Sequence, residues 1–255
     1  QGVDPGLAEL QKQSERFLGQ RGVNLMATCT PYQVGNVPVK GEHCAWMESS
    51  AVIYCNSVLG ARTNVEGKES TGAAALTGRI PYWGYHLPEN RFGTHLIEID
   101  IEVDDMMDWG LLGYFIGYAV EEDIPVLNGV RHRPNLIKLK HFGAAAASSG
   151  GVEMYHIPGV TPEADTVEEA FGPRSILETI RYGAKERRET YEKIQSATDR
   201  KVDFIMLGCP HNSIEQMELI AHLLEGRKIH PDVQLWVHTP RAIRQVADRS
   251  GYCDV

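Results

Sequence analysis

Apolar positions along the chain follow two patterns, one typical of helices and one typical of strands, and segments of the two kinds alternate. Helical spacing or long runs without Gly and Pro predict helices over residues 4–18, 42–59, 70–78, 108–120, 135–149, 175–195, 213–224 and 240–249, with a short helix starting at Thr166. Short apolar runs predict strands over residues 23–27, 95–103, 125–127, 152–157, 202–207 and 233–237. Because strands and helices alternate and the strands are apolar, we expect an α/β fold with parallel or mixed sheets covered by helices.

Local signals support several of these helices. Asp4 precedes Pro5, the arrangement typical of an N-cap followed by proline at the first helical position. Ser213 and Gln216 have the spacing of a capping box. Residues 42–59 are apolar around most of the predicted helix, which indicates a buried helix.

Polar residues within the 42–59 segment recur every seven positions. Glu42, Ser49 and Asn56 would form one line along a helix, and His43, Ser50 and Ser57 a second. A buried helix with such lines either packs on polar partners or faces a cavity.

The long predicted helix over 175–195 suggests two lobes that face one crevice. We expect an N-terminal lobe over residues 1–174 and an α/β lobe over residues 175–255. The chain begins with Gln and stops where a new strand is expected to start, so we also expect it to be a fragment of a longer protein.

Composition narrows the class of function. The chain has 255 residues, of which 42% are hydrophobic and 23% charged, and a net charge of -9. These values are ordinary for a globular protein, and the negative charge argues against nucleic-acid or anionic-membrane partners. The longest apolar run, residues 111–120, is too short to span a bilayer and contains Gly113 and Gly117.

Five cysteines, at positions 29, 44, 55, 209 and 253, do not have the spacing of a disulfide framework. An odd number of thiols without a CxxC motif favours a reducing, cytoplasmic setting. Cys44 and Cys55 lie in the apolar segment and are expected to be small buried hydrophobes.

Cys29 and Cys209 share one context. Each follows a predicted strand, and the next residues are Thr-Pro and Pro-His respectively. Ligands of open α/β sheets gather beyond the carboxyl ends of strands, so we expect both thiols in one crevice. Thiolates are the usual ligands of iron–sulfur clusters, although two thiols alone do not specify one.

Three runs in the sequence, CTPYQVGN, GEHCAWMESSAVIYCNSVLGARTNVEG and LGCPH, closely resemble the large, catalytic part of the aconitase X family. This family includes cis-3-hydroxy-L-proline dehydratases and mevalonate 5-phosphate dehydratases. The resemblance implies an aconitase-like form of the α/β fold and an iron–sulfur-dependent hydro-lyase that removes water from a small hydroxy acid. It also implies a partner, the small swivelling domain, present as a separate subunit or a fused segment.

The resemblance further implies roles for particular residues. Cys29 and Cys209 would be metal ligands, with a third ligand beyond residue 255. Catalytic candidates are His211, Glu48, Ser49 and Ser50. Candidates for substrate binding are Thr30, Tyr32, Glu42, His43, Asn56, Arg62, Thr63 and Asn64. The single Arg in this motif and the acidic composition favour cis-3-hydroxy-L-proline over mevalonate 5-phosphate, whose two anionic ends call for more cations.

Simpler roles remain open for several of these residues. Arg62 could interact with the C-terminal end of the 42–59 helix, where a cation is favourable. Glu42 and His43 could be a cap and a core hydrogen-bonding pair, and His211 could only orient the Cys209 loop. At the level of the whole protein, a non-catalytic scaffold or binding subunit is the alternative. A nucleotide-binding module is disfavoured because no glycine-rich phosphate motif follows a strand.

Overall fold

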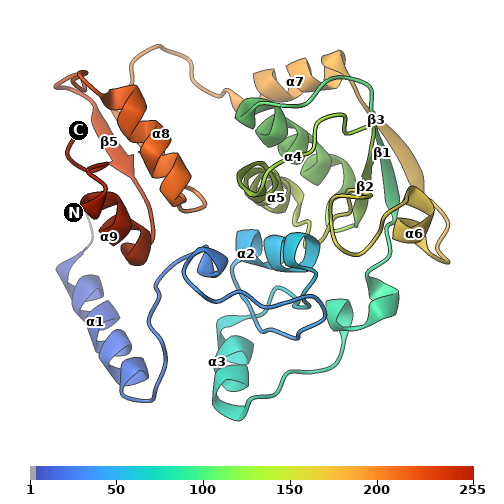
Figure 1. Cartoon of the computed structure of the whole chain (residues 1–255), viewed down its shortest axis with the longest axis horizontal. Helices are drawn as coiled ribbons and strands as arrows, with labels where there is room; N and C mark the ends of the chain where they lie inside the picture. The colour runs from blue at the N-terminus through green and yellow to red at the C-terminus, as the bar shows by residue number, and fades with distance from the viewer. Residues whose placement is uncertain (1–3) are drawn as a thin grey trace.

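The structure is a computed structural model that describes residues 4–255 (Figure 1). Its central sheet has the order β2–β1–β3, where β1 is His95–Ile99, β2 is Pro125–Asn128 and β3 is Glu178–Tyr182. Both pairings are parallel. A second parallel sheet pairs β4 (Phe204–Leu207) with β5 (Gln234–Val237). The predicted α/β fold with parallel sheets and covering helices is therefore confirmed.

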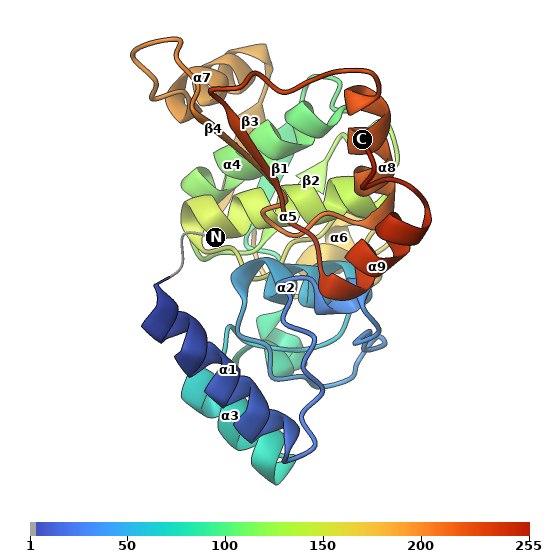
Figure 2. The ribbon, with the colours of Figure 1, turned by 90° about the vertical axis from the view of Figure 1, so that its left-hand side faces the viewer.

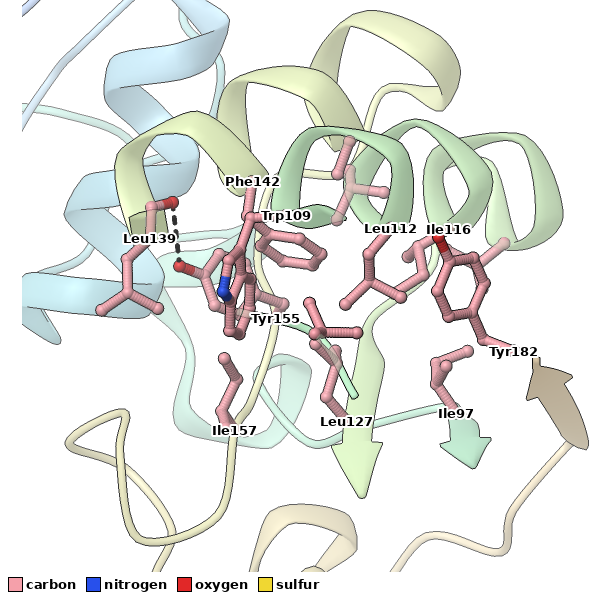
Figure 3. Packing of buried hydrophobic residues seen from close by; sticks show 14 of the residues in the cluster. Ile97, Trp109, Leu112, Ile116, Leu127, Leu139, Phe142, Tyr155, Ile157 and Tyr182 are labelled. Atoms are coloured by element: carbon pink, nitrogen blue, oxygen red, sulfur yellow. Dashed lines mark hydrogen bonds between the residues drawn. The ribbon is translucent and has the colours of Figure 1, made fainter. Parts of the chain in front are cut away.

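The main core lies between the central sheet and two helices, α4 (Met106–Val120) and α5 (Leu136–Gly150). Figure 3 shows Trp109 and Leu112 from α4 and Phe142 from α5 packed over Ile97 and other strand residues. Helix α6 (Val167–Phe171) covers part of the opposite face of the sheet, and its last residues pack on β2. Burial explains why β1 and β2 are apolar runs, whereas the edge strand β3 is largely exposed and mostly polar.

Glycines allow α4 and α5 to approach closely. A Cβ atom built at Gly117 would lie 2.0 Å from Ser149 Oγ and 2.4 Å from the carbonyl oxygen of Ala146. At Gly113 it would lie 2.4 Å from the carbonyl oxygen of Phe142. The two glycines that interrupt the longest apolar run are therefore required by this helix crossing.

The second sheet carries α8 (Ile214–Leu224) and α9 (Arg241–Arg249), which lie apart from α4 and α7 (Ala184–Ile194) in Figure 1. Ser213 and Gln216 form the predicted capping box at the start of α8. The turned view in Figure 2 places α1 (Pro5–Gly19) and α3 (Lys68–Thr77) at one end of the molecule. The Asp4 side chain caps α1 as predicted, by accepting from Leu7 N.

The predicted helix over 42–59 is wrong in its first half. Helix α2 spans Ser49–Tyr54 and continues as a π-helix over Cys55–Leu59. Residues 42–44 are extended instead, because Arg62 N donates to Glu42 O and Cys44 N donates to Arg62 O. The two polar lines drawn from Glu42 and His43 along one helix therefore do not exist.

Three other elements differ from the prediction. Residues 23–27 form no strand: they have no pairing partner among the described residues, and Ala27 has a φ of 45°, in the left-handed region. Residues 152–157 form a single bridge between His156 and Val126 rather than a strand. The predicted helix over 175–195 begins only at Ala184, after strand β3. The division into lobes 1–174 and 175–255 stays a prediction.

Short 3₁₀-helices span Pro31–Gln33, Gly84–His86 and Pro88–Asn90. Within residues 4–255, every helix is too short or too polar to cross a membrane.

Candidate functional site

The two thiols singled out by the sequence lie near one another. Cys29 is half-buried, and its Sγ accepts a hydrogen bond from the backbone N–H of His211 at 3.3 Å. Burial raises the pKa of the Cys29 thiol most, and the nearby Glu48 and Cys209 raise it further. Cys209 is exposed and follows β4 in the expected way. The loop after β4 therefore brings Cys209 and His211 to Cys29.

Polar side chains surround Cys29, and we call Thr28, Cys29, Glu48, Ser50 and His211 the thiol region. Thr28 Oγ1 lies 2.9 Å from His211 Nδ1. Ser50 Oγ donates to Glu48 Oε2 at 2.6 Å, and Ala51 N donates to the same oxygen. Burial lowers the pKa of His211, so its ring favours the neutral form. A neutral imidazole and a carboxylate are both groups that can accept a proton.

The thiol region fits part of an iron–sulfur site. A half-buried thiolate that accepts an N–H···S bond, with a second thiol close by, is the usual environment of a cluster ligand. Coordination would outweigh the raised pKa of Cys29, because a metal-bound thiol is deprotonated. Among residues 4–255, no three His, Cys, Asp or Glu side chains gather as a complete metal site. Cys29 and Cys209 are the thiols that could take part in such a site.

A second group, His43, Arg62 and His86, lies at the other end of the extended 42–48 segment, and we call it the arginine region. Arg62 Nη1 donates to the carbonyl oxygen of His86 at 3.0 Å, and His43 Nδ1 lies 2.9 Å from His86 Nδ1. Among the described residues, three buried atoms here lack a hydrogen-bond partner: Arg62 Nε, His86 Nε2 and Glu66 Oε1. Buried polar atoms without partners are costly, so water or a ligand is expected to satisfy them.

Several substrate-binding candidates use their side chains within the protein. Asn56 accepts from Thr63 N and donates to Thr63 O and Glu153 O. Thr63 Oγ1 donates to Asn64 O and accepts from Trp46 N. These bonds hold the chain that leads to Arg62.

The other candidates are placed as follows. Asn64 Oδ1 accepts from Tyr85 N at 2.8 Å, and Glu42 Oε2 accepts from Val39 N at 2.8 Å. Thr30 is buried beside Thr28 in the thiol region. Ser49 is exposed at the start of α2. Tyr32 stacks on Tyr54 and lines a cavity of about 240 Å³.

Sequence reasoning missed two buried cations. Every nitrogen of the Arg91 guanidinium donates a hydrogen bond, to Glu163, Asn56, Ala61 and Tyr85. Lys140 is 3% exposed and lies on α5, where its Nζ donates to the carbonyl oxygen of His211 at 2.8 Å. The burial of Lys140 could have been predicted, because this residue occupies the apolar face of a helix. Arg91 lies in a loop, where no periodic pattern indicates burial.

Comparison with known proteins gives consistent results. Sequence models described as the first, second and third domains of aconitase X match residues 1–89, 93–192 and 202–255. The phosphomevalonate dehydratase large subunit of Methanocaldococcus jannaschii is 41% identical over 260 residues, which cover 100% of this chain and 63% of that protein. The cis-3-hydroxy-L-proline dehydratase of Pseudomonas aeruginosa is 38% identical over 255 residues, covering 99% of this chain and 44% of that protein.

A crystal structure of Thermococcus kodakaraensis aconitase X, described as the holo-form, matches with a TM-score of 0.88 and 36% identity. The match covers 99% of this chain and 64% of that one. The chain therefore spans between 44% and 64% of the length of these relatives.

Proposed function

The chain belongs to the aconitase X family, and from that premise we propose that it is the main part of a hydro-lyase, a dehydratase of a small hydroxy acid. The observation that carries the proposal is the convergence of Cys29, Cys209 and His211 at the end of β4. Two thiols beside polar, proton-accepting groups suit a dehydration site. A scaffold would have no use for them.

Dehydration of a hydroxy acid needs a Lewis acid for the leaving hydroxyl, a base for the neighbouring proton, and donors for the carboxylate. An iron–sulfur cluster, when bound, would supply the Lewis acid. Cys29 and Cys209 would hold it, and the N–H of His211 would orient and stabilise the Cys29 thiolate.

Proton handling is assigned to the rest of the thiol region. Glu48 accepts from the Ser50 hydroxyl, and the His211 ring faces Thr28, so two groups able to hold a proton lie near Cys29. Ser49, exposed at the start of α2, can meet a partner subunit or substrate at the surface. The small swivelling subunit of the family is proposed as that partner, since the Methanocaldococcus relative is named a large subunit.

Substrate binding is assigned to Thr30, Tyr32 and the arginine region, with Arg62 as a hydrogen-bond donor to substrate oxygens other than those of the carboxylate, such as a phosphate. The first candidate substrate is cis-3-hydroxy-L-proline, supported by the chain's net charge of -9. Mevalonate 5-phosphate is the second candidate. It is favoured by the higher identity, 41% and 47%, of relatives named phosphomevalonate dehydratase large subunit.

The proposal is tested by measuring bound iron and acid-labile sulfide. The measurement is made after anaerobic reconstitution of the full-length protein. We expect a bound cluster in the native protein, loss of most of it in Cys209→Ser, and retention in the control Cys253→Ser, which changes another exposed thiol. Both hydroxy acids are then assayed for dehydration. A native protein that binds no iron and dehydrates neither acid would be a scaffold instead.

A further inference from the structure

Lys140 is a buried cation that no carboxylate of the described residues contacts; Glu215, which lines the same cavity, acts on it only at longer range. Its Nζ donates to two neutral oxygens, the carbonyl of His211 at 2.8 Å and Gln216 Oε1 at 2.5 Å. The salt bridges formed by described lysines belong to Lys138, Lys185 and Lys201. An ammonium group has three protons to donate, so one remains after these two bonds.

The other fully buried cation shows what a purely structural charge looks like in this chain. Arg91 is also 3% exposed, but it forms a bidentate pair with Glu163, and all of its nitrogens are used by the protein. Burying a charge is costly unless an opposite charge and hydrogen bonds compensate it. Lys140 lacks the contacting carboxylate that Arg91 has.

Lys140 also borders open space. It lines the cavity of about 240 Å³ together with Tyr32, Gln33 and Tyr54. The Tyr32 hydroxyl and the Gln33 side-chain oxygen are buried there without a hydrogen-bond partner among the described residues. Because burial raises the pKa of Tyr32, its hydroxyl stays protonated and can donate. An ammonium proton and an unpartnered phenol proton thus belong to residues that line the same cavity.

The cavity adjoins the thiol region. The His211 carbonyl that accepts from Lys140 belongs to the residue whose N–H binds Cys29. Lys140 also lines a second cavity, of about 420 Å³, which includes Cys209. A ligand held at Lys140 would therefore lie beside the place where the reacting hydroxyl is expected.

We propose that Lys140, assisted by the Tyr32 hydroxyl, binds the carboxylate of the hydroxy-acid substrate. This assignment rests on the proposed function, since it takes the ligand to be a hydroxy acid. The carboxylate is common to both candidate substrates, so the role of Lys140 is the same for either. Glu215 lines the same cavity and is exposed, which places a carboxylate where the ring ammonium of a hydroxyproline could bind.

Ligand pairs that differ only in the carboxylate separate this role from a structural one. L-Proline is compared with L-prolinamide, and mevalonate with mevalonolactone, by calorimetric titration of the full-length holoprotein. In the native protein we expect the carboxylate to improve the affinity of at least one pair by about tenfold or more, as for a charge-assisted hydrogen bond. In Lys140→Met this advantage should fall to about twofold or less, while Lys140→Arg should retain part of it.

Lys138→Met is the matched control, because Lys138 lies on the same helix and pairs with Asp104 at the surface. It should keep the full advantage of the carboxylate. If Lys140→Met weakens acid and neutral ligand equally, Lys140 only holds the His211 loop and the proposal is overturned. It is also overturned if the native protein binds the acids no better than their neutral counterparts.

Steady-state assays with both hydroxy acids keep the two proposals distinguishable. Turnover with an unchanged KM in Lys140→Met would overturn the role of Lys140 and leave the dehydratase function standing. A lysine-dependent preference for carboxylates without turnover of either acid would support the role of Lys140 and count against the proposed function.

Discussion

Replacing Arg91 by methionine tests how the candidate site is held in place. The Arg91 guanidinium is 3% exposed and pairs with Glu163, whose side chain is 19% exposed. It also donates to the carbonyl oxygens of Asn56 and Ala61, on the chain that leads to Arg62. Methionine fills similar space but carries no charge and no donors, so Glu163 would be left as a partly buried, unpaired carboxylate.

The expected loss of stability is large. Breaking a buried ion pair by removing one partner typically costs about 3–5 kcal/mol. The carbonyl acceptors left by Arg91 add to this, and water that enters the space offsets part of it, so we expect a loss of about 4 kcal/mol in the free energy of unfolding. A domain has only about 5–15 kcal/mol in total, so the variant should be close to the limit of folding.

The loss of unfolding free energy is measured by denaturant unfolding. The native protein is compared with Arg91→Met, Glu163→Leu and the double variant. Most of the penalty comes from the unpaired carboxylate, so the double variant should lose clearly less than the sum of the two single variants. Arg16→Met is the control, since its pair with Glu9 has side chains 63% and 51% exposed and should contribute under about 1 kcal/mol. A loss for Arg91→Met no larger than that of Arg16→Met would refute the reasoning.

Two further predictions concern stability. Burial lowers the pKa of His156, whose Nε2 lies 2.8 Å from the Arg91 carbonyl oxygen, so the folded protein favours the neutral ring. The unfolded chain takes up the proton first as the pH falls through about 6.5, and stability is lost below that value. His156→Gln should reduce the loss between pH 7.5 and 5.5 by about 1 kcal/mol, measured by denaturant unfolding at each pH; an unchanged loss would contradict this. Gly117→Ala should lower the unfolding free energy by about 1–3 kcal/mol or more, because its Cβ would overlap Ser149 Oγ. In thermal melts the control Gly72→Ala, with no atom within 4 Å of the added carbon, should be neutral or slightly stabilising, and equal effects would count against close packing at Gly117.

The elements that the sequence predicted well are those determined by residues close to one another in the sequence. The start of α8 depends on Ser213 and Gln216, which are three positions apart, and the structure has the capping box that this spacing indicates. Strands β4 and β5 were predicted close to their observed bounds, since each is a short apolar run between polar segments.

The errors occur where a distant partner decides the conformation. Residues 42–48 lack Gly and Pro and have apolar side chains on several sides, which favoured a helix. Their backbone instead pairs with the chain around Arg62, and Glu48 caps the helix that starts one residue later. In the same way, β3 was read as the start of a charged helix, because its pairing with β1 joins residues more than 80 positions apart.

Distant partners also limit what the sequence predicts about the buried charges near the candidate site. Sequence could indicate Cys29 and Cys209, because each thiol lies beside a distinctive Pro-containing turn. It could not distinguish Arg91 from Lys140, since the carboxylate that balances Arg91 lies 72 positions away at Glu163, and no such carboxylate reaches Lys140 in the part of the chain described here. In a protein with a net charge of -9, a buried ammonium that no carboxylate contacts, with only the exposed Glu215 nearby, is a charge that folding compensates incompletely. A substrate carboxylate would compensate it on binding, which is why Lys140, rather than the better-connected Arg91, is the cation to assign to the ligand.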